Sequence, residues 1–261
     1  MSTGLEALAI TDHDTLAGYD RAEPLARAAG LDLVCGIEMS TRFHSRSVHL
    51  LGYFVHEPPT GDFREWLLGL QRSRRDRNLR LIDRLRSLGL DISIEEVEAK
   101  GRSMTGRPHF ARVLIEKGYV ANTEQAFQEY LDESAKGYVQ RQEVDMPEGI
   151  ERIVRAGGVP SLAHPIRVAR RMEHAARNGH DELESWVAEL VKMGLRALEV
   201  FHSDHRPEDV KRYAEMAQRF NLAVTGGSDF HGGNKPKIQL GRGFEGNLDI
   251  PLAVLERLRA L

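Results

Sequence analysis

Short apolar runs that lead into a metal-binding type of side chain recur along this 261-residue chain. Residues 7–10 lead to His13, and residues 222–224 lead through a glycine-flanked loop to Asp229 and His231. Carboxylate oxygens and imidazole nitrogens are ligands for Zn²⁺, Mn²⁺ and Fe²⁺. Because α/β barrels gather their functional groups where strands end, the pattern predicts an α/β barrel that carries a metal centre.

The same arrangement appears again between these two runs. Residues 33–37 lead to Glu38, Val48 precedes His49, and residues 159–163 precede His164. A single histidine after a strand is more often structural than functional, but its repetition at five runs favours a shared site. The candidate metal ligands are therefore His13, Glu38, His49, His164, Asp229 and His231.

The composition favours a cytoplasmic enzyme. A formal net charge of −3 argues against coating a polyanion as the main activity, although it allows a local basic groove. Cys35 is the only cysteine, so no disulfide can form within the chain, and a reducing compartment is expected. No segment has the pattern of a secretory leader or the length of a membrane span. We expect no membrane association, and the sequence indicates no stable protein partner.

The order of predicted elements indicates a barrel interrupted by helices. Strand and helix periods alternate over the first 56 residues, and strand signals then vanish until about Gly157. Amphipathic periodicity predicts one or two helices in residues 63–88 and further helices at 110–116, 123–131 (with Thr123 as N-cap) and 147–156. Alternation resumes with a strand at 197–201, a helix at 207–220 and a strand at 222–225. The expected organisation is a barrel of residues 1–60 and 146–261 with a helical insertion at 61–145.

Five segments, in order along nearly the whole chain, carry a family resemblance: Ala9-Ile10-Thr11-Asp12-His13-Asp14-Thr15, Gly36-Ile37-Glu38-Met39-Ser40, Val48-His49-Leu50-Leu51-Gly52-Tyr53, Leu162-Ala163-His164-Pro165 and Gly227-Ser228-Asp229-Phe230-His231. In these segments the chain resembles the polymerase and histidinol phosphatase (PHP) family of metal-dependent phosphoesterases. It is most similar to the bacterial branch of nucleoside 3′,5′-bisphosphate phosphatases and 5′–3′ exoribonucleases.

The resemblance implies a distorted (β/α)7 barrel that holds up to three divalent ions, Mn²⁺ foremost, with Zn²⁺, Fe²⁺ or Mg²⁺ as alternatives. The implied reaction is hydrolysis at phosphorus. It would remove the 3′-phosphate of nucleoside 3′,5′-bisphosphates, or trim short oligoribonucleotides from the 5′ end. The expected substrate is thus a small nucleotide or a short RNA.

The resemblance also assigns roles to the candidate residues. Glu38, His49 and His164 would form one complete ligand set, and Glu38 would bridge to a second ion. That second ion keeps only Glu38 and Asp229, and a third keeps only His13 and His231. The candidate catalytic residues are His205, His231 and Asp229.

Candidate substrate-binding residues lie outside the metal motifs. Arg107 and His109 precede a predicted helix, and Lys136 follows another, so they could hold a second phosphate through charge-assisted hydrogen bonds. The alternative is that these are ordinary surface residues. His202, at the end of the predicted strand 197–201, is a further candidate for substrate contact.

The chain departs from the family pattern at its start. PHP proteins begin with a strand that carries His-x-His, whereas this sequence opens just before the second strand. We expect that the natural parent has this N-terminal segment and that the present sequence is a truncated form of it. The alternative is that the lineage has lost the segment and the site has decayed. One ion would then bind well and the others weakly. The alternative function is a catalytically silent PHP module that binds metal or nucleotide, and a sugar-phosphate phosphatase of the histidinol phosphatase type is a weaker one.

Overall fold

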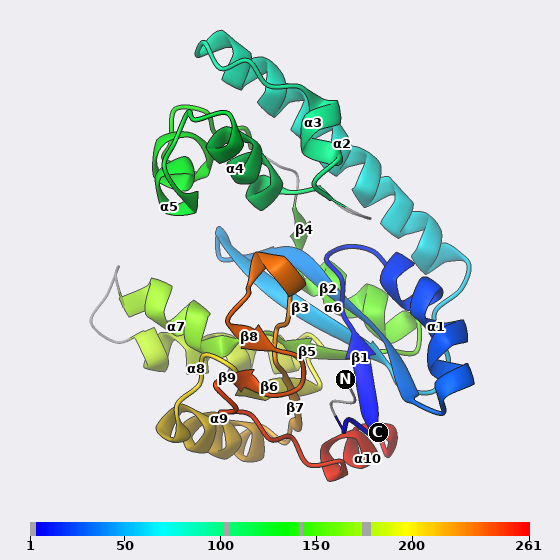
Figure 1. The fold of residues 1–261 in the computed structure, drawn as a ribbon. Coiled ribbons are helices and arrows are strands. Elements are labelled where there is room, and N and C mark those ends of the chain that lie inside the picture. The colour runs from blue at the N-terminus through cyan, green and yellow to red at the C-terminus, as the bar shows by residue number, and fades with distance from the viewer. Residues whose placement is uncertain (1–3, 102–104, 141–142, 174–178) are drawn as a thin grey trace. The chain divides into compact units, whose positions relative to one another are not determined.

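The computed structural model describes residues 4–101, 105–140, 143–173 and 179–261. The chain divides into two compact units, of which unit 1 comprises Met1–Phe63 with Val144–Leu261 and unit 2 comprises Arg64–Glu143. Unit 1 contains the sheet, and unit 2 is helical (Figure 1). Within the described ranges, no helix is both long enough and apolar enough to cross a membrane.

The main sheet of unit 1 has the order β1-β2-β3-β5-β6-β7, with β4 beside β2. Its strands are β1 Ala7–Ile10, β2 Asp32–Phe43, β3 Arg46–Phe54, β4 Val144–Asp145, β5 Val159–Leu162, β6 Ala197–His202 and β7 Ala223–Gly227. Strand β3 runs antiparallel to β2 and β5, whereas the pairs β1–β2, β5–β6 and β6–β7 are parallel. The curled sheet, with β1 and β7 at its two ends, confirms the expected α/β barrel class as a half-barrel (Figure 1).

The β2–β3 hairpin changes where two candidate ligands lie. His44 and Ser45 both have positive φ, 45° and 62°, as a two-residue turn between twisted strands requires. Glu38 pairs with Leu51 and His49 pairs with Ser40, so both candidates lie within strands. The expectation that every ligand follows a strand end is therefore wrong for these two, because antiparallel pairing extends both strands beyond the apolar runs. Residues two apart share a face, so Glu38 and His49 still point to one side.

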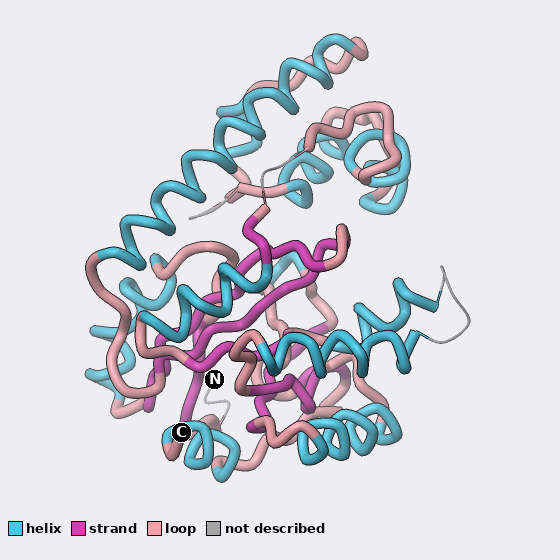
Figure 2. The backbone as a smooth tube through the Cα atoms, turned by 180° about the vertical axis from the view of Figure 1, so that it is seen from behind, coloured by secondary structure: helices cyan, strands magenta, loops and turns pink. Residues whose placement is uncertain are grey.

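Helices cover the outside of this sheet, as Figure 2 shows from behind. They are α1 Ala17–Ala29, α6 Met146–Arg155, α7 Pro165–Glu173, α8 Gly179–Lys192, α9 Pro207–Arg219 and α10 Ala253–Arg259, with a 3₁₀ turn η2 at Gly232–Asn234 and a small hairpin of β8 Ile238–Gln239 and β9 Gly243–Phe244. Helix α6 packs on β2, β3 and β5 through a buried face that includes Ile150 and Ile153. A side chain at Gly52 would put its Cβ 2.9 Å from Ile153, so glycine permits this close approach.

One apolar cluster joins the strands to the C-terminal helix. It consists of Val34, Leu51, Tyr53, Val55, Val159, Ala163, Ala197 and Leu258, with Ala9, Ala223 and Leu255 packed against it. Members from β1, β2 and β7 meet α10 here, so the last helix packs near both ends of the sheet. Arg259 adds two hydrogen bonds of 2.7 and 2.8 Å to the carboxylate of Asp32.

Unit 2 has its own apolar core. Its helices are α2 Asp62–Ser87 (which starts at the unit boundary), α3 Ile94–Glu98, α4 Arg107–Glu116, α5 Thr123–Ala126 and a π-helical turn η1 at Phe127–Leu131. The core residues are Leu81, Ile82, Leu85, Leu90, Ile92, Ile94, Val97, Phe110, Ala111, Val113, Leu114, Val120, Ala126, Tyr130 and Leu131. All belong to the range Arg64–Glu143, so unit 2 buries apolar surface within itself.

Two details of the predicted elements were wrong. The side chain that caps α5 is that of Asn122, which accepts the Gln125 N–H at 2.9 Å, and Thr123 is the first helical residue. Both residue types cap helices well, so the sequence alone could not separate the adjacent positions. A strand also appears before Gly157: β4 pairs two residues with β2, a length too short to give a periodic signal.

Candidate metal centre

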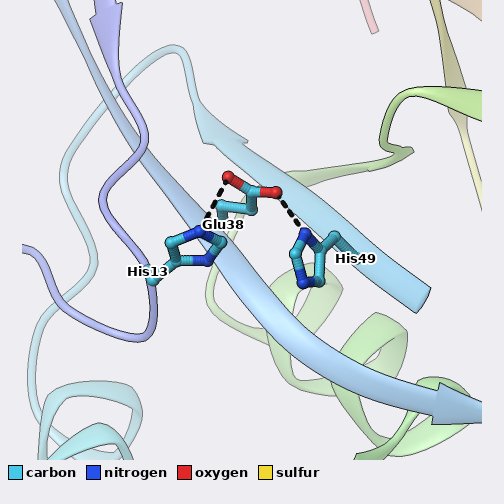
Figure 3. A group of neighbouring side chains, drawn as sticks. All are labelled: His13, Glu38 and His49. Atoms are coloured by element: carbon cyan, nitrogen blue, oxygen red, sulfur yellow. Dashed lines mark ion pairs between the residues drawn. The ribbon is translucent and has the colours of Figure 1, made fainter. Parts of the chain in front are cut away.

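The carboxylate of Glu38 is the centre of a cluster of histidines (Figure 3). Its Oε1 lies 2.6 Å from Nδ1 of His49, and its Oε2 lies 3.7 Å from Nε2 of His13. The ligand atoms of these three residues all lie within 4.8 Å of one another. Glu38 is only 6% exposed, so this carboxylate is held among imidazoles and away from bulk water.

His164 joins the same carboxylate from the loop after β5. Its Nε2 lies 3.1 Å from Oε1 of Glu38 and 3.3 Å from Nδ1 of His49. The expected ligand set of Glu38, His49 and His164 is therefore also close together, and Glu38 belongs to both groups of three.

Backbone pairing in the loop after β1 places His13. The N–H of Asp14 donates to the carbonyl of Glu38 at 3.0 Å, and the N–H of Glu38 donates to the carbonyl of Asp12 at 3.1 Å. The buried carboxylate of Asp14, a residue with φ 54°, accepts the Ser40 N–H at 2.8 Å. These bonds fix the register between the loop and β2, so His13 lies beside Glu38.

A second carboxylate, that of Asp229 in the loop after β7, is in contact with two basic side chains and a histidine. Its Oδ2 lies 2.9 Å from Nη2 of Arg167 and pairs with Nζ of Lys235, and its Oδ1 lies 3.2 Å from Nδ1 of His231. Burial raises the pKa of Asp229, but the neighbouring His202, Lys235 and Arg167 outweigh burial and hold that pKa well below its usual value. Asp229 is thus ionised.

The two carboxylate clusters are connected through histidine rings. The ring centroids of His13 and His231 are 5.9 Å apart, and those of His13 and His49 are 5.0 Å apart. His164 and His202 approach each other at 5.7 Å on the buried side. The structure therefore brings together the sequence-predicted ligands His13, Glu38, His49, His164, Asp229 and His231.

The protonation states suit metal binding. Burial lowers the pKa of His164 to about 4, so this ring is neutral at pH 7 and has a lone pair to offer. Burial raises the pKa of Glu38, yet His13, His49 and His164 together hold it well below its usual value. A neutral imidazole and an ionised carboxylate are the forms that bind divalent ions.

The donor set fits a divalent transition-metal ion. It combines imidazole nitrogens with a buried, ionised carboxylate, and the Nε2 atom of His164 faces the same carboxylate. Glu38, His49, His164 and His13 would hold such an ion.

Two predicted functional histidines lie at buried positions near the end of β6. His202 is 1% exposed and His205 is 5% exposed. Nδ1 of His205 lies 2.7 Å from the carbonyl of Val200, so the ring donates there through Nδ1–H. Glu38 and His164 are buried to a similar degree, so the predicted catalytic role of His205 and substrate contact of His202 stay predictions.

Sequence reasoning missed three polar residues of the site. Glu199 on β6 accepts the His164 N–H at 2.6 Å, and Arg167 and Lys235 contact Asp229. Burial raises the pKa of Glu199 to about 7. Arg167 follows His164 by one helical turn, at the start of α7, and this spacing is the signal that could have identified it.

The predicted phosphate-binding residues lie in unit 2. Arg107 Nη1 donates to the carbonyl of Leu131 at 3.1 Å, and Lys136 Nζ lies 3.6 Å from a carboxylate oxygen of Glu129. Nδ1 of His109 accepts the Gly106 N–H at 3.0 Å, which caps α4 and leaves the proton of the neutral ring on Nε2. Burial lowers the pKa of His109, so the neutral ring is favoured.

Three characterised proteins are similar to this chain over most of their length. A 5′-3′ exoribonuclease of Haemophilus influenzae is 31% identical over 87% of this chain and 80% of its own length. A phosphoribosyl 1,2-cyclic phosphate 1,2-diphosphodiesterase of Eggerthella lenta is 33% identical over 88% and 84%. A 3′,5′-nucleoside bisphosphate phosphatase of Chromobacterium violaceum is 28% identical over 86% and 76%. No family model matches the chain.

The fold points to the same class of protein. A crystal structure from Bifidobacterium adolescentis, assigned as a metal-dependent phosphoesterase, superposes with a TM-score of 0.79 at 30% identity, covering 98% of this chain and 86% of that one. The curled sheet and its carboxylate–imidazole cluster define a metal-dependent phosphoesterase, a hydrolase. The chain belongs to the PHP family of these enzymes, as its sequence motifs predicted.

Proposed function

We propose that this chain hydrolyses phosphate esters of small nucleotides or short RNA with a divalent ion held at Glu38. The reaction would remove the 3′-phosphate of a nucleoside 3′,5′-bisphosphate or trim a short oligoribonucleotide from its 5′ end. The observation that carries the proposal is the buried Glu38 carboxylate between His13, His49 and His164. The exoribonuclease and bisphosphatase relatives support this substrate class.

Mn²⁺ is the ion we propose for this centre. The family resemblance implies Mn²⁺ foremost; carboxylate and water ligands suit this ion, and imidazole ligands suit the alternatives Zn²⁺ and Fe²⁺. Such an ion neutralises phosphate oxygens and lowers the pKa of a bound water. We also infer a reducing, cytoplasmic location, which the buried position of the only cysteine, Cys35, supports.

The chain's own residues would orient the ester. His13, His49 and His231 have side chains 33%, 30% and 30% exposed, so these three form the accessible side of the cluster. The guanidinium of Arg167, 32% exposed, is a donor for a phosphoryl oxygen. Asp229, which Arg167 contacts, would fix that guanidinium. We retain Arg107, His109 and Lys136 as the proposed contacts to the second phosphate.

A metal-binding variant tests the proposal. Glu38→Gln keeps the shape of the side chain but removes the charge that the histidines surround. We expect bound Mn²⁺ and phosphate release from adenosine 3′,5′-bisphosphate to fall by at least about 100-fold, since the ligand itself is lost. Glu189→Gln is the matched control, because Glu189 pairs with His44 at the surface. Bound Mn²⁺ without turnover of any phosphate ester would instead indicate a silent binding module.

A substrate comparison tests the second-phosphate contact. Arg107→Ala should lower kcat/KM for the bisphosphate about 10- to 150-fold, the effect of one charge-assisted contact, and leave a 3′-monophosphate nearly unchanged. Arg112→Ala, an exposed change on the same helix, is the control. Equal losses on both substrates would refute the role of Arg107. Faster hydrolysis of histidinol phosphate than of any nucleotide would refute the substrate class.

A further inference from the structure

Two residues of the metal centre have strained backbones. His164 has φ 29° and Asp229 has φ 53°, and neither is a glycine. Positive φ is costly for such residues and persists only where the surroundings hold it in place. Each residue lies two positions after a strand, His164 after β5 and Asp229 after β7, and β6 lies between these two strands in the sheet. Side chains of β6 are therefore placed to hold both of these residues.

Glu199 of β6 holds the backbone of His164. Its Oε2 accepts the His164 N–H at 2.6 Å, and both residues are buried. The other oxygen, Oε1, lies 3.5 Å from the position a Cβ would take on Gly227 of β7, so Glu199 is enclosed on that side as well. A hydrogen bond to a carboxylate in a buried site is strong and directional.

His202 of β6 faces Asp229 with a defined tautomer. The N–H of Asp204 donates to Nδ1 of His202 at 3.0 Å, and a backbone N–H can only donate. The proton of the neutral ring is therefore on Nε2, which lies 3.7 Å from Oδ2 of Asp229. Arg167 and Lys235 reach the same carboxylate with side chains 32% exposed, whereas His202 approaches from the buried side.

We propose that β6 supplies two positioning residues for the metal centre: Glu199 fixes the strained backbone of His164, and the Nε2–H of His202 orients the carboxylate of Asp229. Neither residue touches the substrate. Glu199 acts through a hydrogen bond of 2.6 Å, whereas the Nε2–H of His202 acts through electrostatic attraction to the Asp229 carboxylate at 3.7 Å, a distance too long for a hydrogen bond. Groups that hold ligand residues in place fix ligand geometry and raise metal affinity. The inference rests on the proposed metal-binding role of His164 and on the role of Asp229 as a ligand of a second ion, which the family resemblance implies.

Two measurements on the metal-free protein test the arrangement itself. Long-range ¹⁵N–¹H correlation spectra should show His202 as the Nε2–H tautomer. The amide of His164 should exchange slowly with solvent in the parent and at least about 10-fold faster in Glu199→Leu, because the acceptor is gone. A Nδ1–H tautomer, or equal exchange in both proteins, would overturn the proposal.

Metal affinity tests the consequence. Glu199→Leu and His202→Phe should each weaken Mn²⁺ binding, measured by titration calorimetry, about 10- to 100-fold. Glu199→Gln keeps an acceptor oxygen and should restore affinity to near that of the parent. Thr225→Val is the matched control, because Thr225 is a buried polar residue of β7 whose hydroxyl lies 2.8 Å from that of Ser161.

A purely structural role would give a different result. Lower thermal stability with unchanged Mn²⁺ affinity in both β6 variants would contradict the positioning role. Equal loss of affinity in Thr225→Val would do the same, since it would show that any buried polar residue matters. If the parent binds no Mn²⁺, the proposed metal centre is wrong, and the tautomer and exchange measurements still decide whether β6 holds these two residues.

Discussion

At the scale of single residues, burial decides which histidines of unit 1 can carry a proton. Burial lowers the pKa of both His164 and His205 to about 4, although the rings have different surroundings. His164 faces Glu38, whereas His205 bonds to the Val200 carbonyl and packs 4.9 Å from the Tyr213 ring. Because the folded protein holds such a ring in its neutral form, the free energy of unfolding depends on pH.

The acid sensitivity of the fold should depend in part on His205. In the unfolded chain its pKa is near 6.5, and in the folded protein it is about 4, so the unfolded state takes up the proton first. The stabilising effect of the neutral ring is fully present above pH 6.5 and is lost as pH falls toward 4. Melting temperature should therefore fall less steeply over this range in His205→Leu than in the parent, with EDTA present. His44→Gln is the control at an exposed histidine. Parallel pH curves for parent and His205→Leu would contradict this account.

At the scale of elements, the C-terminal helix α10 shows that buried apolar packing contributes more to the free energy of unfolding than a surface ion pair does. Leu258 is 4% exposed in a cluster with Val34 and Ala197, whereas Arg259 and Asp32 form their bidentate pair at a partly exposed site. Exposed pairs contribute about 1 kcal/mol or less, because solvent screens them. Loss of a buried leucine costs more, since it leaves a cavity.

A pair of α10 variants tests this ranking. Leu258→Ala should lower the free energy of unfolding by about 2 kcal/mol or more, and Arg259→Ala by less than about 1 kcal/mol. Leu261→Ala, at a residue 61% exposed, should change it by less than about 0.5 kcal/mol. Urea titrations of the three variants measure the difference. A larger loss in Arg259→Ala than in Leu258→Ala would reverse the ranking.

The sequence predicted long periodic elements well and short ones poorly. Residues 147–156 gave a clear apolar spacing and form α6 at Met146–Arg155. The two-residue strands β4, β8 and β9 have no period to detect, because only their partners create them. The place of Glu38 and His49 within strands also depends on a partner, since each strand is extended by the other.

The site residues also divide into those that a local sequence pattern predicts and those that only contacts in the folded chain bring together. Asp229 and His231 share a short motif, so the sequence identified them as a pair. Arg167 and Lys235 contact Asp229 from separate segments, and Glu199 contacts His164 from the next strand. The contacts of Lys235 and Glu199 are properties of the folded sheet and leave no spacing in the sequence, whereas Arg167 leaves one signal, its place one helical turn after His164.

At the scale of the whole molecule, each unit has an apolar cluster of its own. The described core residues of unit 2, which include Leu85 and Leu114, all belong to Arg64–Glu143. The metal-ligand candidates belong to unit 1 alone. Units with separate cores can unfold separately.

Destabilising unit 2 should therefore leave the metal centre intact. Leu114 is fully buried, so Leu114→Ala should cost about 2–5 kcal/mol and speed amide exchange throughout unit 2. Mn²⁺ affinity should stay within about 2-fold of the parent if the units are energetically separate. The matched control is Leu68→Ala, at a residue 51% exposed. A loss of Mn²⁺ affinity in Leu114→Ala alone would show coupling between the units.

The buried position of Cys35 makes its alkylation rate a measure of local opening of the sheet. The only thiol of the chain is 1% exposed and lies on β2, where Cys35 pairs with Ile10 of the four-residue end strand β1. An alkylating reagent can reach that sulfur only while this end of the sheet is open. The alkylation rate at low reagent concentration would thus report the equilibrium population of the open form at this end of the sheet, on the same strand as Glu38.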